Sequence, residues 1–199
     1  SSASEDGLVM FGGDLSPARL LAAYRRGIFP WPLDESEQTP IPWWSPDPRA
    51  VLEFDRLHVS RRLARTIRSG VFELTHNADF EGVVDGCAEP RDDGEGTWLT
   101  RELRDSLIKL HEGGIAHSVE AWREGELVGG VYGLAIGGYF SAESMFFNHR
   151  DASKVALVQL VEHLRHSRFV LLDIQVLTDH TERLGAIEIP REVFLTRLA

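Results

Sequence analysis

The sequence predicts an α+β fold in which helices flank a mixed, largely antiparallel sheet. Three β-rich runs between residues 118 and 146 alternate with glycine turns, as in an antiparallel meander. Segments with helix start and stop signals lie on both sides of that meander. The chain has 199 residues, of which 43% are hydrophobic, so it can bury a generous core. We expect a small domain over residues 1–50 and a larger one over residues 51–199.

The N-terminal part predicts one helix and then an irregular aromatic segment. The helix begins at Ser16, has a proline in its first turn and ends at Gly27. Six prolines between residues 30 and 48 exclude a long helix or a central strand, because each removes a backbone donor and restricts its predecessor. The tryptophans among them indicate a fixed surface for a nucleobase or an apolar acyl group. A hydrophobic cluster that pins a small N-terminal unit is an equally good interpretation.

Residues 60–70 predict a short basic helix with Ser60 as N-cap and Gly70 after its end. The net charge is −10, so a polyanion must be held by a local basic patch. The helix provides such a patch, and we predict that it contacts nucleic acid. A solvated helix surface is the plainer alternative. The basic residues concerned, three of them on one face at i, i+4 and i+7, are Arg61, Arg65 and Arg68, together with Arg62.

The other elements are predicted from helix and strand propensities and from the positions of capping residues, glycines and prolines. We predict a strand over 71–75, a helix over 77–87, a polar loop over 89–96, and a helix over 101–112 that Thr100 caps and two glycines stop. The meander strands are 118–122, 127–134 and 139–146. The chain ends with a helix over 152–166, a buried strand over 169–175, a short helix ending near Gly185 and a helix after Pro190.

The sequence also indicates the compartment. No apolar run approaches the roughly 20 residues that cross a bilayer, and the first residues lack the pattern of a signal peptide. The single cysteine, Cys87, has no internal disulfide partner, which fits a reducing compartment and a free structural thiol. We expect a cytoplasmic protein with no membrane partner.

A meander followed by a helix and another strand is the core order of the acetyltransferase-like fold of the Gcn5-related superfamily. Enzymes of this fold that use acyl-CoA hold its pyrophosphate with a glycine-containing loop that opens the helix after the meander. Residues 147–151 stand at that point and contain no glycine. We therefore expect an acyl donor other than CoA and no cofactor.

Six blocks of unusual composition occur in order at 11–17, 24–31, 43–50, 96–100, 143–146 and 173–175. They resemble the motifs of the leucyl/phenylalanyl-tRNA–protein transferase family along essentially the whole chain. The resemblance implies a bacterial cytosolic enzyme that moves leucine or phenylalanine from aminoacyl-tRNA to the N-terminal arginine or lysine of a protein, which marks that protein for N-end rule degradation. It also implies a small N-terminal domain beside an acetyltransferase-like one. The chain departs from the family pattern at Ala142, where a glycine often stands, and in ending at Ala199, earlier than longer members.

Aminoacyl-tRNA is an activated ester, so attack by an amine needs alignment, a deprotonated amine and support for the oxyanion. Asp173 and Gln175 lie two apart on a predicted strand and therefore project to one face. Such a pair can also simply satisfy the polar groups of a strand end. The resemblance favours catalysis, with Asp173 as proton acceptor and Gln175 as relay or oxyanion partner.

Glu143 lies among small and apolar neighbours on a predicted strand, where a carboxylate needs a cationic partner. The partner is either the N-terminal arginine or lysine of an acceptor protein or one of the chain's own arginines. The resemblance implies the acceptor site, together with Tyr24 and Trp44.

The donor side chain requires an apolar pocket. Leucines repeat at i, i+3 and i+7 on the helix over 152–166, a stripe that is usually core. The resemblance implies a pocket drawn from Val131, Phe140, Leu157, Leu160, Leu164 and Leu172. It also implies that Trp98 stacks on the terminal adenine of the tRNA, whereas a core tryptophan is the alternative.

His163 and His166 form an H-x-x-H pair, but no further ligand stands at a convincing spacing, so we predict no metal site. Two other functions stay open: an acetyltransferase-like enzyme with an atypical acyl-CoA site, and a noncatalytic tRNA-binding module. We expect a monomer whose partners are aminoacyl-tRNA carrying leucine or phenylalanine as donor and a protein with N-terminal arginine or lysine as acceptor.

Overall fold

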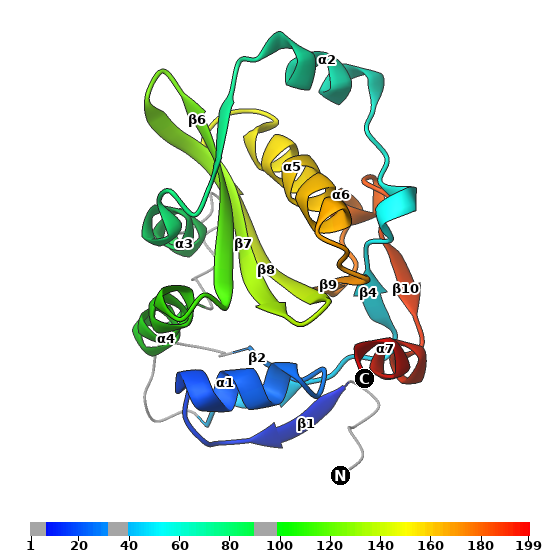
Figure 1. The fold of residues 1–199 in the computed structure, drawn as a ribbon. Helices are drawn as coiled ribbons and strands as arrows, with labels where there is room; N and C mark the ends of the chain where they lie inside the picture. Colours follow the sequence, from blue (N-terminus) through cyan, green and yellow to red (C-terminus); the bar gives the residue numbers. More distant parts are fainter. Residues whose placement is uncertain (1–6, 32–39, 90–98) are drawn as a thin grey trace.

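The computed structural model describes residues 7–31, 40–89 and 99–199 and contains two sheets (Figure 1). The smaller sheet has the strand order β1-β3-β2, with β1 at Leu8–Phe11, β2 at Phe29–Pro30 and β3 at Pro42–Trp44. The larger sheet has the order β10-β4-β9-β8-β7-β6-β5. Its strands are β4 (Arg49–Val51), β5 (Glu73–His76), β6 (Ala116–Arg123), β7 (Glu126–Ile136), β8 (Tyr139–Phe147), β9 (Leu171–Gln175) and β10 (Ile187–Ile189). Only β8 and β9 pair in parallel among these strands, so the predicted mixed, largely antiparallel sheet is confirmed.

Helices cover both faces of the larger sheet. They are α1 (Pro17–Tyr24), α2 (Arg61–Ser69), α3 (Phe80–Ala88), α4 (Arg101–Glu112), α5 (Ala152–His166), α6 (Asp179–Glu182) and α7 (Arg191–Leu198), with a 3-10 turn at Phe54–Arg56. Figure 1 shows α5 on one side of the meander and α3 with α4 on the other. Successive strand residues serve the two sides, as the pleat requires: Val131 packs in the core that contains α5, and Tyr132 packs with α3 and α4.

Local capping explains where the predicted helices begin and end. The Ser60 hydroxyl accepts a hydrogen bond from the Leu63 amide at 3.2 Å, and Gly70 closes α2 in the left-handed region at φ +64°. Thr100 caps α4 in the same way. Ser16 makes no side-chain cap bond, so the start of α1 relies on the proline that follows it.

The expectation that prolines exclude a central strand is wrong. β3 lies between β1 and β2, and β4 lies between β10 and β9. Pro42 is the first residue of β3, and β4 begins one residue after Pro48, so neither proline interrupts the interior of a ladder. The boundary predicted at residue 50 falls inside β4, and the division into two domains stays a prediction.

The remaining elements agree with the predicted ones within a few residues. The predicted strand over 71–75 begins two residues later, at Glu73, and the predicted helix over 77–87 begins at Phe80 because Asp79 caps it. The five short strands β1, β2, β3, β4 and β10 were not predicted. Most of the polar loop predicted over 89–96 lies outside the described residues. In the described part of the chain, no helix has both the length and the apolar character needed to span a membrane.

Two irregularities shape the centre of the sheet. The parallel pairing of β8 with β9 ends at Ser141 and Asp173, although β8 continues to Phe147. In the β7–β8 ladder Tyr132 opposes Ser144 and Gly133 opposes Ala142, which leaves Glu143 as the extra residue of a bulge. In the β4–β9 ladder the register also shifts, which leaves Ile174 unpaired just before Gln175. Strands β8 and β9 therefore separate where both carry polar side chains.

Candidate active site

Glu143 and Gln175 meet at the point where β8 and β9 separate. The Gln175 side-chain amide donates to the Glu143 carboxylate at 3.1 Å and to the Ser141 hydroxyl at 2.9 Å. Ser141 in turn donates to Glu143 at 2.7 Å, and the Tyr24 hydroxyl donates to the other Glu143 oxygen at 2.6 Å. Gln175 has φ +59°, an uncommon left-handed conformation for a residue with a side chain. Bulges and strained backbone of this kind concentrate at functional sites.

The Glu143 carboxyl has an unusual titration. Burial raises its pKa from 4.5 to about 7, and the hydrogen bonds from Tyr24 and Ser141 only partly offset that rise. Burial and the neighbouring Glu143 raise the pKa of the Tyr24 hydroxyl, so Tyr24 stays a proton donor. Glu143 itself is only partly buried, so solvent or a substrate can reach it. A carboxyl group that titrates near neutrality can exchange protons with an amine.

Asp173 lies behind this cluster in a buried ion pair. Both its carboxylate oxygens accept from the Arg49 guanidinium, at 2.8 and 2.6 Å, and neither side chain has solvent exposure. Tyr139 donates to Asp173 at 2.7 Å, and the Gln175 backbone amide donates at 2.9 Å. The structure thus brings Asp173 and Gln175 into one network, but it seats Asp173 in the interior and not on an open surface. Their predicted catalytic roles stay predictions.

Arg49 is a site residue that the sequence interpretation missed. Its guanidinium lies between the rings of Phe29 and Phe194, 4.8 and 4.6 Å from their centroids, and it donates to the Gly27 carbonyl at 3.1 Å. Arg49 and Asp173 are 124 residues apart, so no local pattern links them. The sequence nevertheless held a hint, because an arginine next to apolar strand residues needs a buried anion.

Ser141 and Tyr139 were missed as well, and here a signal existed. They precede Glu143 by two and four residues on β8, and residues at that spacing share one face of a strand. All three side chains reach the same network. Three hydrogen-bonding residues in a row on one face of a buried strand indicate a polar network. A search for such rows would have identified Ser141 and Tyr139.

Two residues, Tyr24 and Trp44, were predicted beside Glu143 in the acceptor site, and their positions in the structure differ. Tyr24 contacts Glu143 directly. Trp44 lies on β3, and its indole nitrogen is buried without a hydrogen-bond partner among the described residues. Trp98 lies outside the described residues. The roles predicted for Trp44 and Trp98 therefore stay predictions.

The predicted donor pocket consists of packed core residues. All six side chains are at least 96% buried, and they share a single hydrophobic cluster between α5 and the sheet: Val131, Phe140, Leu157, Leu160, Leu164 and Leu172. This is the core interpretation that the helical spacing favoured. A pocket for leucine or phenylalanine among them requires side chains to move, and their pocket role stays a prediction.

The basic helix is placed as predicted. Arg61, Arg65 and Arg68 are exposed on α2. Arg62 is also exposed, but it forms an ion pair with Asp151 at 3.0 Å. Three arginines thus present charge to solvent, and Arg62 instead joins α2 to the start of α5.

The raised pKa of Glu143 predicts a pH-dependent stability. The unfolded carboxyl ionises near 4.5 and the folded one near 7, so its contribution is complete below pH 4.5 and is lost as the pH rises through 7. We expect the wild type to lose on the order of 2 kcal/mol relative to Glu143→Gln across this window, because one pKa unit corresponds to about 1.4 kcal/mol and partial exposure reduces the effect. Urea unfolding between pH 4.5 and 8 measures the difference, with Glu53→Gln as control. Parallel pH curves for wild type and Glu143→Gln would contradict the prediction.

Comparison with known proteins finds the same family by family models and by individual relatives. Residues 51–199 match the family model described as leucyl/phenylalanyl-tRNA protein transferase, and residues 13–47 match the model of its N-terminal domain. The leucyl/phenylalanyl-tRNA–protein transferase of Stutzerimonas stutzeri is 53% identical over 194 residues, which cover 98% of this chain and 84% of that protein. The protein of the same name from Solidesulfovibrio magneticus is 55% identical over 197 residues, with 98% and 78% covered.

Solved structures resemble the chain at lower similarity. A GCN5-related N-acetyltransferase from Kribbella flavida has a TM-score of 0.44 and 11% identity, covering 81% of this chain and 56% of that one. L-PGS from Bacillus licheniformis has a TM-score of 0.44 and 15% identity, covering 64% and 44%.

Proposed function

This chain belongs to the leucyl/phenylalanyl-tRNA protein transferase family, and on that premise we propose that it transfers leucine or phenylalanine from aminoacyl-tRNA to the N-terminal arginine or lysine of an acceptor protein. In this family the product is a degradation signal of the N-end rule pathway. The reaction forms a peptide bond between the amine nitrogen of the acceptor and the carbonyl carbon of the esterified amino acid. The ester bond to the ribose breaks, and the ribose hydroxyl leaves with a proton.

The Glu143–Gln175 contact is the observation that carries the mechanism. An acceptor amine has a pKa of about 7.7–8.0 in model compounds, so at neutral pH it must lose a proton before it attacks. Glu143 has a pKa of about 7 and is partly accessible, which suits a proton acceptor for such an amine. We assign the proton transfer to Glu143, and the Gln175 amide to orientation of the carboxylate and support of the developing oxyanion.

Asp173 receives a supporting role in this mechanism. Its oxygens are occupied by Arg49, Tyr139 and the Gln175 amide, so an amine has no free oxygen to approach. The pair with Arg49 holds the end of β9, and thereby Gln175, opposite Glu143. The proton-acceptor role predicted for Asp173 from the sequence is the competing assignment, and the variants described in the Discussion separate the two.

The cationic side chain of the acceptor is recognised by charge. The chain carries ten more negative than positive groups, which favours approach of a basic N-terminus. Trp44, partly buried on β3, offers an aromatic ring for an arginine or lysine stem. The donor side chain enters the apolar cluster beneath α5, where Leu157 and Phe140 lie.

Transfer of labelled leucine tests the function. The purified chain is mixed with [14C]leucyl-tRNA and a peptide that begins with arginine, and the label is expected in the peptide without added CoA. A peptide that begins with glutamate is the matched control and should stay unlabelled. Dependence on CoA would assign an acyl-CoA enzyme, and RNA binding without product would assign a noncatalytic module.

The arginines on α2 predict a salt-dependent affinity for tRNA. Each phosphate contact contributes about 0.9 to the slope of log K against log salt on a duplex. We expect Arg65→Gln with Arg68→Gln to lower the slope by about 2 and to weaken tRNA binding severalfold. Fluorescence anisotropy between 50 and 200 mM salt measures this, and Arg168→Gln, an exposed arginine outside α2, is the control. An unchanged slope would show that α2 does not contact phosphates.

A further inference from the structure

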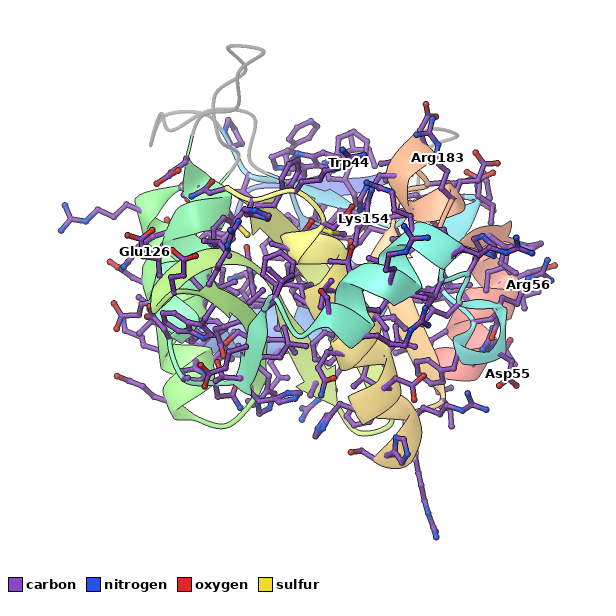
Figure 2. All side chains as sticks on the ribbon, turned by 90° about the horizontal axis from the view of Figure 1, so that it is seen from above. Trp44, Asp55, Arg56, Glu126, Lys154 and Arg183 are labelled. Carbon is purple, nitrogen blue, oxygen red and sulfur yellow. The ribbon has the colours of Figure 1, made fainter. Side chains whose placement is uncertain are left out.

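A hollow at the carboxyl end of β8 has no role in the proposed mechanism. It consists of two adjoining cavities of about 540 and 410 Å³, which share Arg62, Lys154 and His180 as lining residues. Arg183 also lines the first cavity, and Arg150 the second. We call it the α2/α5/α6 cleft, after the helices that border it. Figure 2 shows Lys154 and Arg183 beside α2, on the same side of the molecule.

The charge of this cleft is opposite to that of the protein. Four lining residues are permanently cationic, Arg62, Arg150, Lys154 and Arg183, against two carboxylates, Asp151 and Asp179, which leaves a local charge of +2. The whole chain carries −10. An acidic protein that gathers cations in a concave surface has a local attraction for anions against its overall field.

The cations are held in place and not fully neutralised. Asp151 has only 6% side-chain exposure, and it pairs with Arg62 at 3.0 Å and with Lys154 at 3.8 Å. These contacts fix two cationic groups at the entrance of α5. Arg150 and Arg183 have no ion-pair partner among the described residues, so their charges remain available to a ligand.

His180 supplies an independent sign of an unfilled contact. Its Nε2 atom is buried and has no hydrogen-bond partner in the described part of the chain, which is uncommon for a buried polar atom. Burial lowers the pKa of His180, and the nearby charges of Lys154 and Arg183 lower it further. His180 lines both cavities, so an anion bound there is the nearest candidate partner for this nitrogen.

The position of the cleft relates it to the reaction. It lies at the carboxyl end of β8, the strand that carries Glu143, and is bordered by α6, the helix that follows β9. Phe147, which lines the cleft, is four residues after Glu143 on β8, or about 13 Å along a strand. On its other side the cleft reaches Arg62, on the same helix as the outward-facing arginines. The cleft thus adjoins the proposed duplex contact on α2 and lies at the end of the strand that carries Glu143.

We propose that the α2/α5/α6 cleft binds a backbone phosphate of the single-stranded 3′ end of the tRNA, between the duplex held by α2 and the ester held at Glu143 and Gln175. This inference rests on the proposed function. The side chains of Lys154, Arg183 and His180 supply the anion contacts at a place where the connection from β8 to α5 has no glycine loop. A soluble nucleotide such as CoA offers the same phosphate chemistry, and the test distinguishes the two sources.

Two RNA probes and two paired variants test the proposal. One probe is an acceptor-stem duplex with its single-stranded 3′ tail, and the other is the same duplex made blunt. We expect Lys154→Gln with Arg183→Gln to weaken binding of the tailed duplex about tenfold at 0.1 M salt and to lower its salt slope by about 0.7, the value for one phosphate contact on a single strand. The same variant should bind the blunt duplex like the wild type. The matched pair Arg65→Gln with Arg68→Gln should weaken both probes.

Kinetics give a second readout. With leucyl-tRNA as donor, the cleft variant should raise KM for the tRNA about tenfold and leave kcat within a factor of two, because its residues lie outside the reacting groups. Unchanged circular dichroism and urea midpoints establish that the variant is folded, as expected for partly exposed side chains.

The outcomes separate the inference from the function beneath it. If the wild type binds the tailed duplex and transfers leucine but the cleft variant matches it, the inference is overturned and the function stands. If the cleft variant weakens the blunt duplex equally, the cleft is part of the duplex contact and the inference is wrong. Displacement of the tailed duplex by micromolar CoA would assign the cleft to a soluble nucleotide and also overturn it. A wild type that neither binds the tailed duplex nor transfers leucine refutes the proposed function itself.

Discussion

Replacing Arg49 with methionine is expected to destabilise the protein by about 3–5 kcal/mol, the range for breaking a buried ion pair from one side. The substitution leaves the Asp173 carboxylate, which has no solvent exposure, without its guanidinium partner. It also removes the cation between Phe29 and Phe194. Urea unfolding at pH 7 measures the loss as a lower midpoint at an unchanged slope.

Two further variants control this result. Arg197→Met breaks a pair with Glu53 in which both side chains are about one third exposed, and it should cost less than about 1 kcal/mol. The double variant Arg49→Met with Asp173→Leu removes both charges and should be more stable than Arg49→Met alone, because no unpaired ion is left in the interior. If Arg49→Met unfolds at the same urea concentration as Arg197→Met, the pair does not have the importance assigned to it.

Replacing Glu143 with glutamine is expected to lower kcat by about 10²-fold or more, the usual contribution of a general base. Glutamine keeps the size of the side chain: its carbonyl oxygen can accept from Ser141 and Gln175 while its NH2 group donates to the Tyr24 hydroxyl, so the fold and the tRNA affinity should change little. The wild-type rate should rise with pH around 7, where Glu143 loses its proton, and then again with the amine near 8. In Glu143→Gln only the rise of the rate near pH 8, which comes from the amine, should remain.

Asp173→Asn provides the contrast for the catalytic assignment. If Asp173 positions Gln175, this variant should be less stable and slower, but its rate should still rise with pH around 7. If instead this rise disappears in Asp173→Asn and persists in Glu143→Gln, then Asp173 is the proton acceptor. Single-turnover rates at saturating leucyl-tRNA separate chemistry from binding in both variants.

Local chemistry made most of the fold predictable. The caps at Ser60, Gly70 and Thr100 and the glycine turns of the meander each determine a boundary by contacts within a few residues. The short strands β1, β2, β3, β4 and β10 escaped prediction because two to four residues hold too little pattern, and most of their pairing partners lie far away in the sequence. The prediction that the prolines exclude a central strand was wrong, because a proline at the first residue of a strand removes no hydrogen bond from the ladder.

The site was predictable only in part, for the same physical reason. Glu143 and Gln175 stand out as polar residues in apolar strands, and the structure does bring them together. The bulges that aim them depend on register across three strands, which no single segment encodes. Arg49 was missed because its role depends on the ion pair with Asp173, which lies 124 residues later in the sequence. The cleft residues come from α2, α5 and α6, and only folding assembles them.

The position of Arg49 also makes the site depend on α7. Phe29 comes from an early strand, Asp173 from a late one and Phe194 from α7, so the guanidinium has all its neighbours only after the last helix docks. A nascent chain still lacking α7 would expose this arginine to water on one side and leave Gln175 loosely held. We therefore expect Gln175 to be held opposite Glu143 only when α7 is docked.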